Sequence, residues 1–177
     1  NVKNKKIIFV INTLKEGGAA KILAFVANLC TNLFETVYII TVFSGETHVS
    51  LDDRINLIDL GMKVNKGILT KISWRFKLAK ILRREILRIN PDVVCAFISD
   101  VIVNTKFALL GTNIPLVAAE RGDPYTLNWM WKGLTKLVYS TCDYLVFQTE
   151  MARDFFKDKV MDKSIIIANP YIYEGYQ

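Results

Sequence analysis

The sequence has few of the residues that metal centres and disulfide-bonded scaffolds require. Its 177 residues include one histidine, His48, and three cysteines that are far apart in the chain. Each cysteine lies in an apolar segment, as is typical of reduced and buried thiols. A His/Cys metal cluster and a Cys–His nucleophile pair therefore have almost no residues to draw on, and we expect no bound metal.

Flexible and membrane-spanning stretches are also scarce. Nine glycines and four prolines stand beside 51% hydrophobic residues, a composition that excludes a disordered chain. No apolar run approaches the ~18 residues that cross a bilayer, and Ile7–Ile11 is too short for the apolar core of a signal peptide. The sequence predicts a soluble cytoplasmic domain, for which the membrane contact to consider is peripheral, at the inner face.

Several enzyme signatures are missing as well. The sequence contains no G-x-G-x-x-G dinucleotide fingerprint, no P-loop G-K-[ST] and no G-x-S-x-G elbow. It also lacks the D-x-D pair that holds a metal-bound nucleotide in one class of sugar transferase. The net charge of +6 predicts anionic partners. Nucleic acid is not indicated, because aromatic residues do not alternate with lysine and arginine along one face.

Short apolar runs alternate with helical segments along the whole chain. The runs are continuous rather than alternating, as in strands buried on both faces. The predicted strands are Ile7–Ile11, Thr36–Phe43, Ile55–Leu60, Asp92–Phe97, Ile114–Ala119, Asp143–Phe147 and Ser164–Ala168. The predicted helices are a segment that follows Gly17–Gly18 and runs to Leu33, then Ile72–Ile89, Val101–Leu110, Trp129–Thr141 and Glu150–Phe156. This order predicts an α/β fold: a Rossmann-like, mainly parallel sheet of about seven strands with helices on both faces.

Polar residues follow most of the predicted strands. Ligands of such sheets bind outside the carboxyl ends of the strands, so these residues are expected to line a cleft. The candidates are Asn12, Ser99, Asp100, Asp123, Gln148 and Thr149, together with Glu120 and Arg121. Two structural alternatives remain open. Ser99 or Asp100 and Thr149 are well placed to cap helices, and the Glu120–Asp123 cluster could form a structural ion pair.

The first predicted strand leads into Gly17, Gly18 and Ala19. Glycines let a ligand approach the backbone closely, and the following helix N-terminus favours an anion such as phosphate. The loop therefore predicts a phosphate site. A tight turn without a ligand is the alternative.

The predicted helix Ile72–Ile89 has two distinct faces. Apolar residues at helical spacing are expected to face the core, namely Ile72, Phe76, Ala79, Leu82, Ile86 and Ile89. Four basic residues form a second stripe, namely Lys77, Lys80, Arg84 and Arg88. A solvated basic face explains this stripe, and binding to anionic phospholipid is the sharper hypothesis. Trp129 and Trp131 suit either a membrane interface or a core.

Four features, in the same order over nearly the whole chain, resemble the N-terminal half of family 4 glycosyltransferases of the bacterial surface-polysaccharide type. These are retaining enzymes with the two-domain GT-B fold. The features are the strand leading to Gly17-Gly18-Ala19, the cluster Glu120-Arg121-Gly122-Asp123-Pro124, the pair Gln148-Thr149, and Ile165-Ile166-Ile167-Ala168-Asn169-Pro170. The glycine pair is common among proteins, whereas the E-R-x-D-P cluster with a terminal N-P is more specific.

The resemblance implies a division of the protein into domains. Residues 1–168 would form the acceptor-side domain, and residues 169–177 would begin the linker to a donor domain that this sequence does not contain. That missing domain would carry the E-x7-E glutamates. The fragment alone is expected to be inactive. The whole enzyme would move a sugar, with retention, from a nucleotide-sugar, expected to be UDP-linked, to a glycan or lipid-linked glycan in polysaccharide biosynthesis.

The resemblance also implies roles for individual residues. Gly17, Gly18 and Ala19 would lie against the donor's diphosphate. Glu120 and Arg121 fall where many relatives carry a histidine at the reaction centre, so they are the expected catalytic residues, with Arg121 steadying negative charge. The nucleotide-sugar is a substrate, and no cofactor is expected. Asp123 is expected mainly to shape its loop.

Two other function classes fit parts of the sequence. One is a stand-alone, non-catalytic module that binds an anion or a sugar in the same cleft. The other is a dinucleotide-dependent oxidoreductase, with Glu46 after the second strand as the acid that would hold the ribose. The missing glycine fingerprint makes the oxidoreductase the weakest of the three.

Overall fold

A computed structural model describes residues 2–15, 17–63, 68–156 and 160–169, with only the backbone given for 68–71. The expected linker at 170–177 lies outside the described residues. Seven strands form one sheet in the order β3-β2-β1-β4-β5-β6-β7, and every neighbouring pair is parallel. The strands are β1 (Lys6–Ile11), β2 (Thr36–Thr41), β3 (Ile55–Asp59), β4 (Val93–Phe97), β5 (Leu116–Glu120), β6 (Tyr144–Phe147) and β7 (Ser164–Ile166). The predicted fold class is therefore confirmed.

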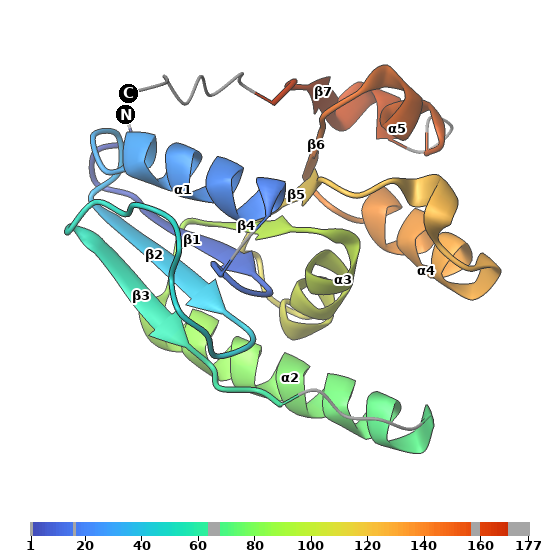
Figure 1. Cartoon of the computed structure of the whole chain (residues 1–177), viewed down its shortest axis with the longest axis horizontal. Helices are drawn as coiled ribbons and strands as arrows, with labels where there is room; N and C mark the ends of the chain where they lie inside the picture. Colours follow the sequence, from blue (N-terminus) through green and yellow to red (C-terminus); the bar gives the residue numbers. More distant parts are fainter. Residues whose placement is uncertain (1, 16, 64–67, 157–159, 170–177) are drawn as a thin grey trace.

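Helices cover both faces of this sheet (Figure 1). The helices are α1 (Gly18–Cys30), α2 (Ile68–Ile89), α3 (Ser99–Ala108), α4 (Trp129–Ser140) and α5 (Glu150–Asp154). Alternate residues of β1 enter different cores, as the two-residue period of a strand requires. Phe9 packs under α1, whereas Ile8 and Val10 pack with residues of α2 to α5. Both cores are fully buried, which explains why the strands read as continuous apolar runs.

Helix α2 differs most from the sequence-based prediction. It begins at Ile68, four residues before the predicted start at Ile72. Leu82, Ile86 and Ile89 are buried as expected, but Ile72 and Phe76 are 53% and 74% exposed. The reason is length. A helix of 22 residues spans roughly 33 Å, whereas the six-residue strand β1 spans roughly 20 Å, so the first turns of α2 extend past the sheet.

Other boundaries shift by one to three residues. Helix α1 ends at Cys30 rather than Leu33, and α3 begins at Ser99 rather than Val101. Strand β5 includes Glu120, which the sequence placed in the following loop. This last shift matters, because it fixes the direction in which the Glu120 side chain points.

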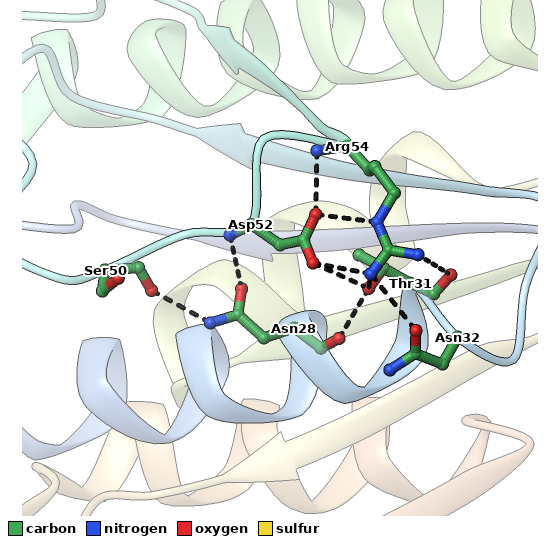
Figure 2. A network of polar contacts seen from close by, with 6 residues as sticks. All are labelled: Asn28, Thr31, Asn32, Ser50, Asp52 and Arg54. Carbon is green, nitrogen blue, oxygen red and sulfur yellow. Dashed lines mark hydrogen bonds and ion pairs between the residues drawn. The ribbon is translucent and has the colours of Figure 1, made fainter.

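The segment before β3 is tied to the C-terminal end of α1, at the edge of the sheet opposite the carboxyl ends of the strands. Figure 2 shows the residues involved, namely Asn28, Thr31, Asn32, Ser50, Asp52 and Arg54. Asn28 donates to the Ser50 carbonyl at 3.1 Å and accepts from the Asp52 amide at 2.9 Å. The Arg54 guanidinium binds the Asp52 carboxylate at 2.7 Å and holds the pKa of Asp52 far below its usual range. The network anchors this loop away from the candidate site.

Candidate functional site

Two helix N-termini meet at the carboxyl edge of the sheet. Strands β1 and β4 are neighbours, but the chain leaves β1 toward β2 and leaves β4 toward β5, in opposite directions across the sheet. Helices α1 and α3 therefore lie on opposite faces (Figure 1), and both begin at the same topological switch point. Ligands of open α/β sheets bind at such points.

The N-terminus of α1 is open to a ligand. Gly17 precedes the helix with φ 116° and ψ 159°, a conformation that residues with a side chain rarely adopt, and no side chain of the described residues caps the helix. A Cβ atom added at Gly17 or Gly18 would meet nothing within 4 Å. The described residues therefore leave room beside the first turn of α1, where unpaired amide N–H groups favour an anion. Ala19 follows in the first turn of the helix.

The N-terminus of α3 is strained and also lacks a side-chain cap. Ile98 connects β4 to α3 with φ 72°, a positive value that is costly for a β-branched residue. Neither Ser99 nor Asp100 caps α3, so that alternative is wrong. Asp100 instead forms an ion pair of 2.6 Å with Arg75. The Arg75 guanidinium also lies 4.4 Å from the centre of the Trp131 ring. Trp131 is thus a packing residue.

Two other predicted site residues have capping or structural roles, and a third has a buried polar atom. Thr149 accepts from the Ala152 amide at 3.1 Å and caps α5, which confirms the capping alternative. Asp123 accepts from the Tyr125 amide at 2.9 Å and starts a 3-10 turn, so it shapes its loop as expected. Asn12 follows β1, and its Oδ1 atom is buried without a hydrogen-bond partner among the described residues.

Glu120 points into the core rather than out of the carboxyl edge. Its side chain is 2% exposed. One carboxylate oxygen accepts from the Gly122 amide at 2.7 Å, and the other accepts from the Tyr139 hydroxyl on α4. Burial raises the pKa of Glu120, against the lowering effect of these hydrogen bonds. The carboxylate therefore holds the start of the following loop through the Gly122 amide. This geometry does not favour a catalytic role for Glu120.

Arg121, the next residue, points the other way and is half-buried. Its Nη1 donates to Asn169 Oδ1 at 2.9 Å and to the Ile167 carbonyl at 3.4 Å. Its guanidinium carbon lies 5.7 Å from the centre of the Phe97 ring. These partners are all uncharged, and Glu120, the neighbouring carboxylate, is bound elsewhere. Burial lowers the pKa of Arg121, but an arginine keeps its charge at any physiological pH.

The surroundings of Arg121 are apolar. The residue borders a cavity of about 270 Å³ between α1 and the sheet, whose lining includes Ile22, Phe25, Cys95 and Phe97. A charge acts over a greater range in such a medium than in water. Arg121 therefore brings to the carboxyl edge a permanent positive charge that no carboxylate of the described residues neutralises.

Gln148 and Asn169 complete the arrangement around Arg121. The Asn169 Nδ2 donates to Gln148 Oε1 at 3.1 Å, and the Gln148 Nε2 donates to the Arg121 carbonyl at 3.2 Å. The sequence placed Gln148 among the residues that line the cleft of the acceptor-side domain, and treated Asn169 as the start of a linker. The N-P motif after the last strand was the only sequence feature that drew attention to Asn169, and a motif of two residues does not predict a contact with the distant Arg121.

The basic stripe lies apart from these residues, on the surface of α2. Lys77, Lys80, Arg84 and Arg88 are all exposed. Glu85 pairs with two of them, Arg84 at 3.2 Å and Arg88 at 2.9 Å. The exposed Trp129 at the start of α4 is 82% accessible. No helix among the described residues is long and apolar enough to cross a membrane.

A curated protein with a related sequence has a sugar-transfer function in its name. No family model matches the chain. The GalNAc-α-(1→4)-GalNAc-α-(1→3)-diNAcBac-PP-undecaprenol α-1,4-N-acetyl-D-galactosaminyltransferase of Campylobacter jejuni is 30% identical over 141 residues. The alignment covers 79% of this chain and 39% of that protein. The chain therefore spans about two fifths of this relative's length.

Solved structures share the fold over nearly the whole chain. HepE of Anabaena, in complex with UDP and glucose, has a TM-score of 0.67 at 14% identity over 95% of this chain and 45% of its own. The lipopolysaccharide outer core galactosyltransferase WaaB has a TM-score of 0.71 at 12% identity, over 93% and 46%. The fold is that of the GT-B glycosyltransferases. The UDP-GlcNAc 2-epimerase of Neisseria meningitidis, bound to UDP-GlcNAc, shares it too, with a TM-score of 0.64 at 17% identity over 93% and 46%.

Proposed function

We propose that this chain is the acceptor-side part of a glycosyltransferase whose full-length form moves a sugar from a nucleotide-sugar to a glycan or lipid-linked glycan. We take UDP as the nucleotide and retention as the stereochemical course. The domain of residues 1–168 would then work with a donor domain elsewhere in the protein. The relative's name, which contains a PP-undecaprenol glycan, supports the choice of acceptor, and the UDP-sugars bound to structures of this fold support the choice of nucleotide.

One observation carries this proposal, namely the charge of Arg121. Among the described residues, the half-buried Arg121 guanidinium has only uncharged hydrogen-bond partners, so its charge is incompletely neutralised there, and a bound anion would neutralise it. The departing nucleotide diphosphate is such an anion, and its negative charge grows as the bond to the sugar breaks. Fixed donors that stabilise developing charge in this way are a main source of catalytic rate. The open N-terminus of α1 would hold a second part of the diphosphate.

The proposal assigns the protein's own positive charge, rather than a bound metal, to leaving-group departure. Arg121→Ala in the full-length protein is therefore expected to lower kcat/KM for the UDP-sugar by about 100-fold, the order found for loss of one charge-stabilising donor. Arg121→Lys keeps the charge but loses the planar fork and should fall in between.

Arg83→Ala serves as the matched control, because Arg83 also binds uncharged carbonyl oxygens, at the C-terminal end of α3. Sugar transfer to a lipid-linked or free glycan acceptor is the readout. Equal rates for Arg121→Ala and the wild type would refute the proposal.

A second candidate function is favoured by one specific observation. The fold is shared with UDP-GlcNAc 2-epimerases at nearly the same TM-score as with HepE. An epimerase would convert its sugar nucleotide without any acceptor. Incubation of the full-length protein with UDP-GlcNAc alone, followed by NMR of the sugar, separates the two. A new C2 epimer would favour this candidate, and transfer that depends on an acceptor would favour the first.

Peripheral contact with an anionic membrane is a further part of the proposed function. The exposed basic stripe on α2 and the exposed Trp129 would face the inner leaflet, where a lipid-linked acceptor resides. Juxtamembrane lysine and arginine residues contribute about 1 kcal/mol each at such a surface. Because Glu85 partly neutralises Arg84 and Arg88, the gain here is smaller than four independent charges would give.

Charge reversal of the stripe tests this contact. Replacing Lys77, Lys80, Arg84 and Arg88 by glutamate should weaken binding to phosphatidylglycerol vesicles on the order of 100-fold. Vesicles of phosphatidylcholine alone serve as the control, and neither protein should bind them tightly. Unchanged binding to the anionic vesicles would show that the stripe is only a solvated face.

A further inference from the structure

Three loops that are far apart in the sequence are joined by a closed ring of hydrogen bonds at the carboxyl edge. Arg121 follows β5, Gln148 follows β6, and Asn169 lies shortly after β7. Arg121 Nη1 donates to Asn169 Oδ1 at 2.9 Å, Asn169 Nδ2 to Gln148 Oε1 at 3.1 Å, and Gln148 Nε2 to the Arg121 carbonyl at 3.2 Å. Parallel pairing of β5, β6 and β7 brings the three loops side by side.

The ring fixes the orientation of both amide groups. A guanidinium can only donate, so the atom of Asn169 that faces it must be the oxygen. The Asn169 NH₂ group then faces Gln148 and requires an acceptor there. Gln148 in turn directs its own NH₂ group to the Arg121 carbonyl. Each amide therefore donates once and accepts once, and no member can be replaced by a carboxylate without placing two acceptors together.

The ring restrains Arg121 at two points, its guanidinium and its own carbonyl. A long side chain at the mouth of a cavity has several rotamers, and an undirected guanidinium would lose entropy whenever it bound an anion. Preorganised donors avoid that loss and stabilise developing charge more effectively. On this basis we propose that Gln148 and Asn169 are positioning residues that hold the Arg121 guanidinium for the departing diphosphate. This inference rests on the proposed function of Arg121.

The assignment changes the expected role of Gln148, which the sequence placed in the cleft of the acceptor-side domain, where it would contact the acceptor. A positioning residue for the donor diphosphate should affect the affinity for UDP and leave the KM of the acceptor unchanged. An acceptor contact should do the reverse. The kinetic constants of a Gln148→Met variant, which preserves the length of the side chain and removes its hydrogen bonds, therefore separate the two roles.

The experiment uses the full-length protein with a double-mutant cycle. Asn169→Ala and Gln148→Met are each expected to lower kcat/KM for the UDP-sugar about tenfold and to weaken UDP inhibition similarly, as the loss of one hydrogen bond to a charged or restrained group would. In the Arg121→Ala background each should change kcat/KM less than twofold. Asn113→Ala, at an exposed asparagine in the loop before β5, is the control and should match the wild type.

The outcomes distinguish this inference from the proposed function. If Arg121→Ala lowers kcat/KM as proposed, and Asn169→Ala lowers it by the same factor in the wild-type and the Arg121→Ala backgrounds, the ring does not act through Arg121 and the inference is wrong. If Arg121→Ala has full activity, the proposed role of Arg121 fails. Crystal structures of full-length Asn169→Ala test the ring in either case. If the Arg121 guanidinium keeps its wild-type position beside the residues that follow β7, the inference is wrong. If it moves to another position, the inference is supported.

Discussion

The buried carboxylate of Glu120 makes a prediction that can be worked out from the structure. Glu120→Gln keeps the shape of the side chain and removes its charge. The glutamine oxygen can still accept from the Gly122 amide, and its NH₂ group can donate to the Tyr139 oxygen, so both contacts survive in neutral form. What the substitution eliminates is the titration of a group that is 2% exposed.

The sign of the effect follows from the direction of the pKa shift. Burial raises the pKa of Glu120 in the folded chain above its ordinary value, which is about 4.3 when the chain is unfolded. The folded state then binds more protons than the unfolded state between the two pKa values. The contribution of Glu120 to stability is therefore complete below a pH of about 4.3 and is lost as the pH rises through the folded pKa, at about 1.4 kcal/mol for each pH unit between them.

Urea unfolding of the 177-residue chain, followed by tryptophan fluorescence at pH 4 to 8, measures this loss. At pH 4 the wild type and Glu120→Gln should agree within about 1 kcal/mol, because both side chains are neutral. As the pH rises, the free energy of unfolding of the wild type should fall relative to that of the variant. Glu35→Gln, at an exposed carboxylate, is the control and should run parallel to the wild type. Parallel curves for Glu120→Gln as well would refute the reasoning.

Further predictions concern the loop before α1 and the network of Figure 2. Gly17→Ala should cost about 1–3 kcal/mol of unfolding free energy, because the backbone at φ 116° is strained for alanine. Gly18→Ala, one residue later and inside the helix, should instead be neutral or add up to about 1 kcal/mol, and urea unfolding compares the two. Asp52→Asn removes the carboxylate that Arg54 binds and should lower Tm at pH 7. Since the folded pKa of Asp52 is lowered, its contribution is present above a pH of about 4 and is lost as the pH falls further, so the difference in Tm should shrink in acid. Calorimetry at several pH values measures this difference in Tm, and a difference that stays constant with pH would contradict this account.

The local sequence was sufficient to predict the architecture. Short apolar runs such as Ile7–Ile11 are typical of buried strands, and the segments between them have the spacing of helices. Continuous apolar runs indicate strands that are covered on both faces of the sheet. These patterns also predicted where the strands end, and therefore the edge of the sheet at which Gly17–Gly18, Ser99 and Glu120 lie. Capping of α5 by Thr149 was also anticipated, because a cap depends only on residues within one turn.

The periodicity of α2 shows where such reasoning stops. It identified which residues share a face, but Ile72 and Phe76 are exposed because the helix extends past the sheet. The extent of the neighbouring elements is not encoded in the helix's own pattern. Similarly, Glu120 and Arg121 were nominated together as catalytic residues, yet consecutive residues at a strand end point to opposite faces. One of them is buried against Tyr139, and the other lies at the carboxyl edge.

The sequence by itself determined the order of strands and helices, the parallel sheet and the edge where polar residues collect, since these depend on short-range hydrophobic patterns and chain connectivity. The tertiary structure alone decided which of those residues touch. Arg121 meets Gln148 and Asn169 across separations of 27 and 48 residues. Those contacts exist because β5, β6 and β7 pair side by side, and pairing between distant segments leaves no local signature in any one of them.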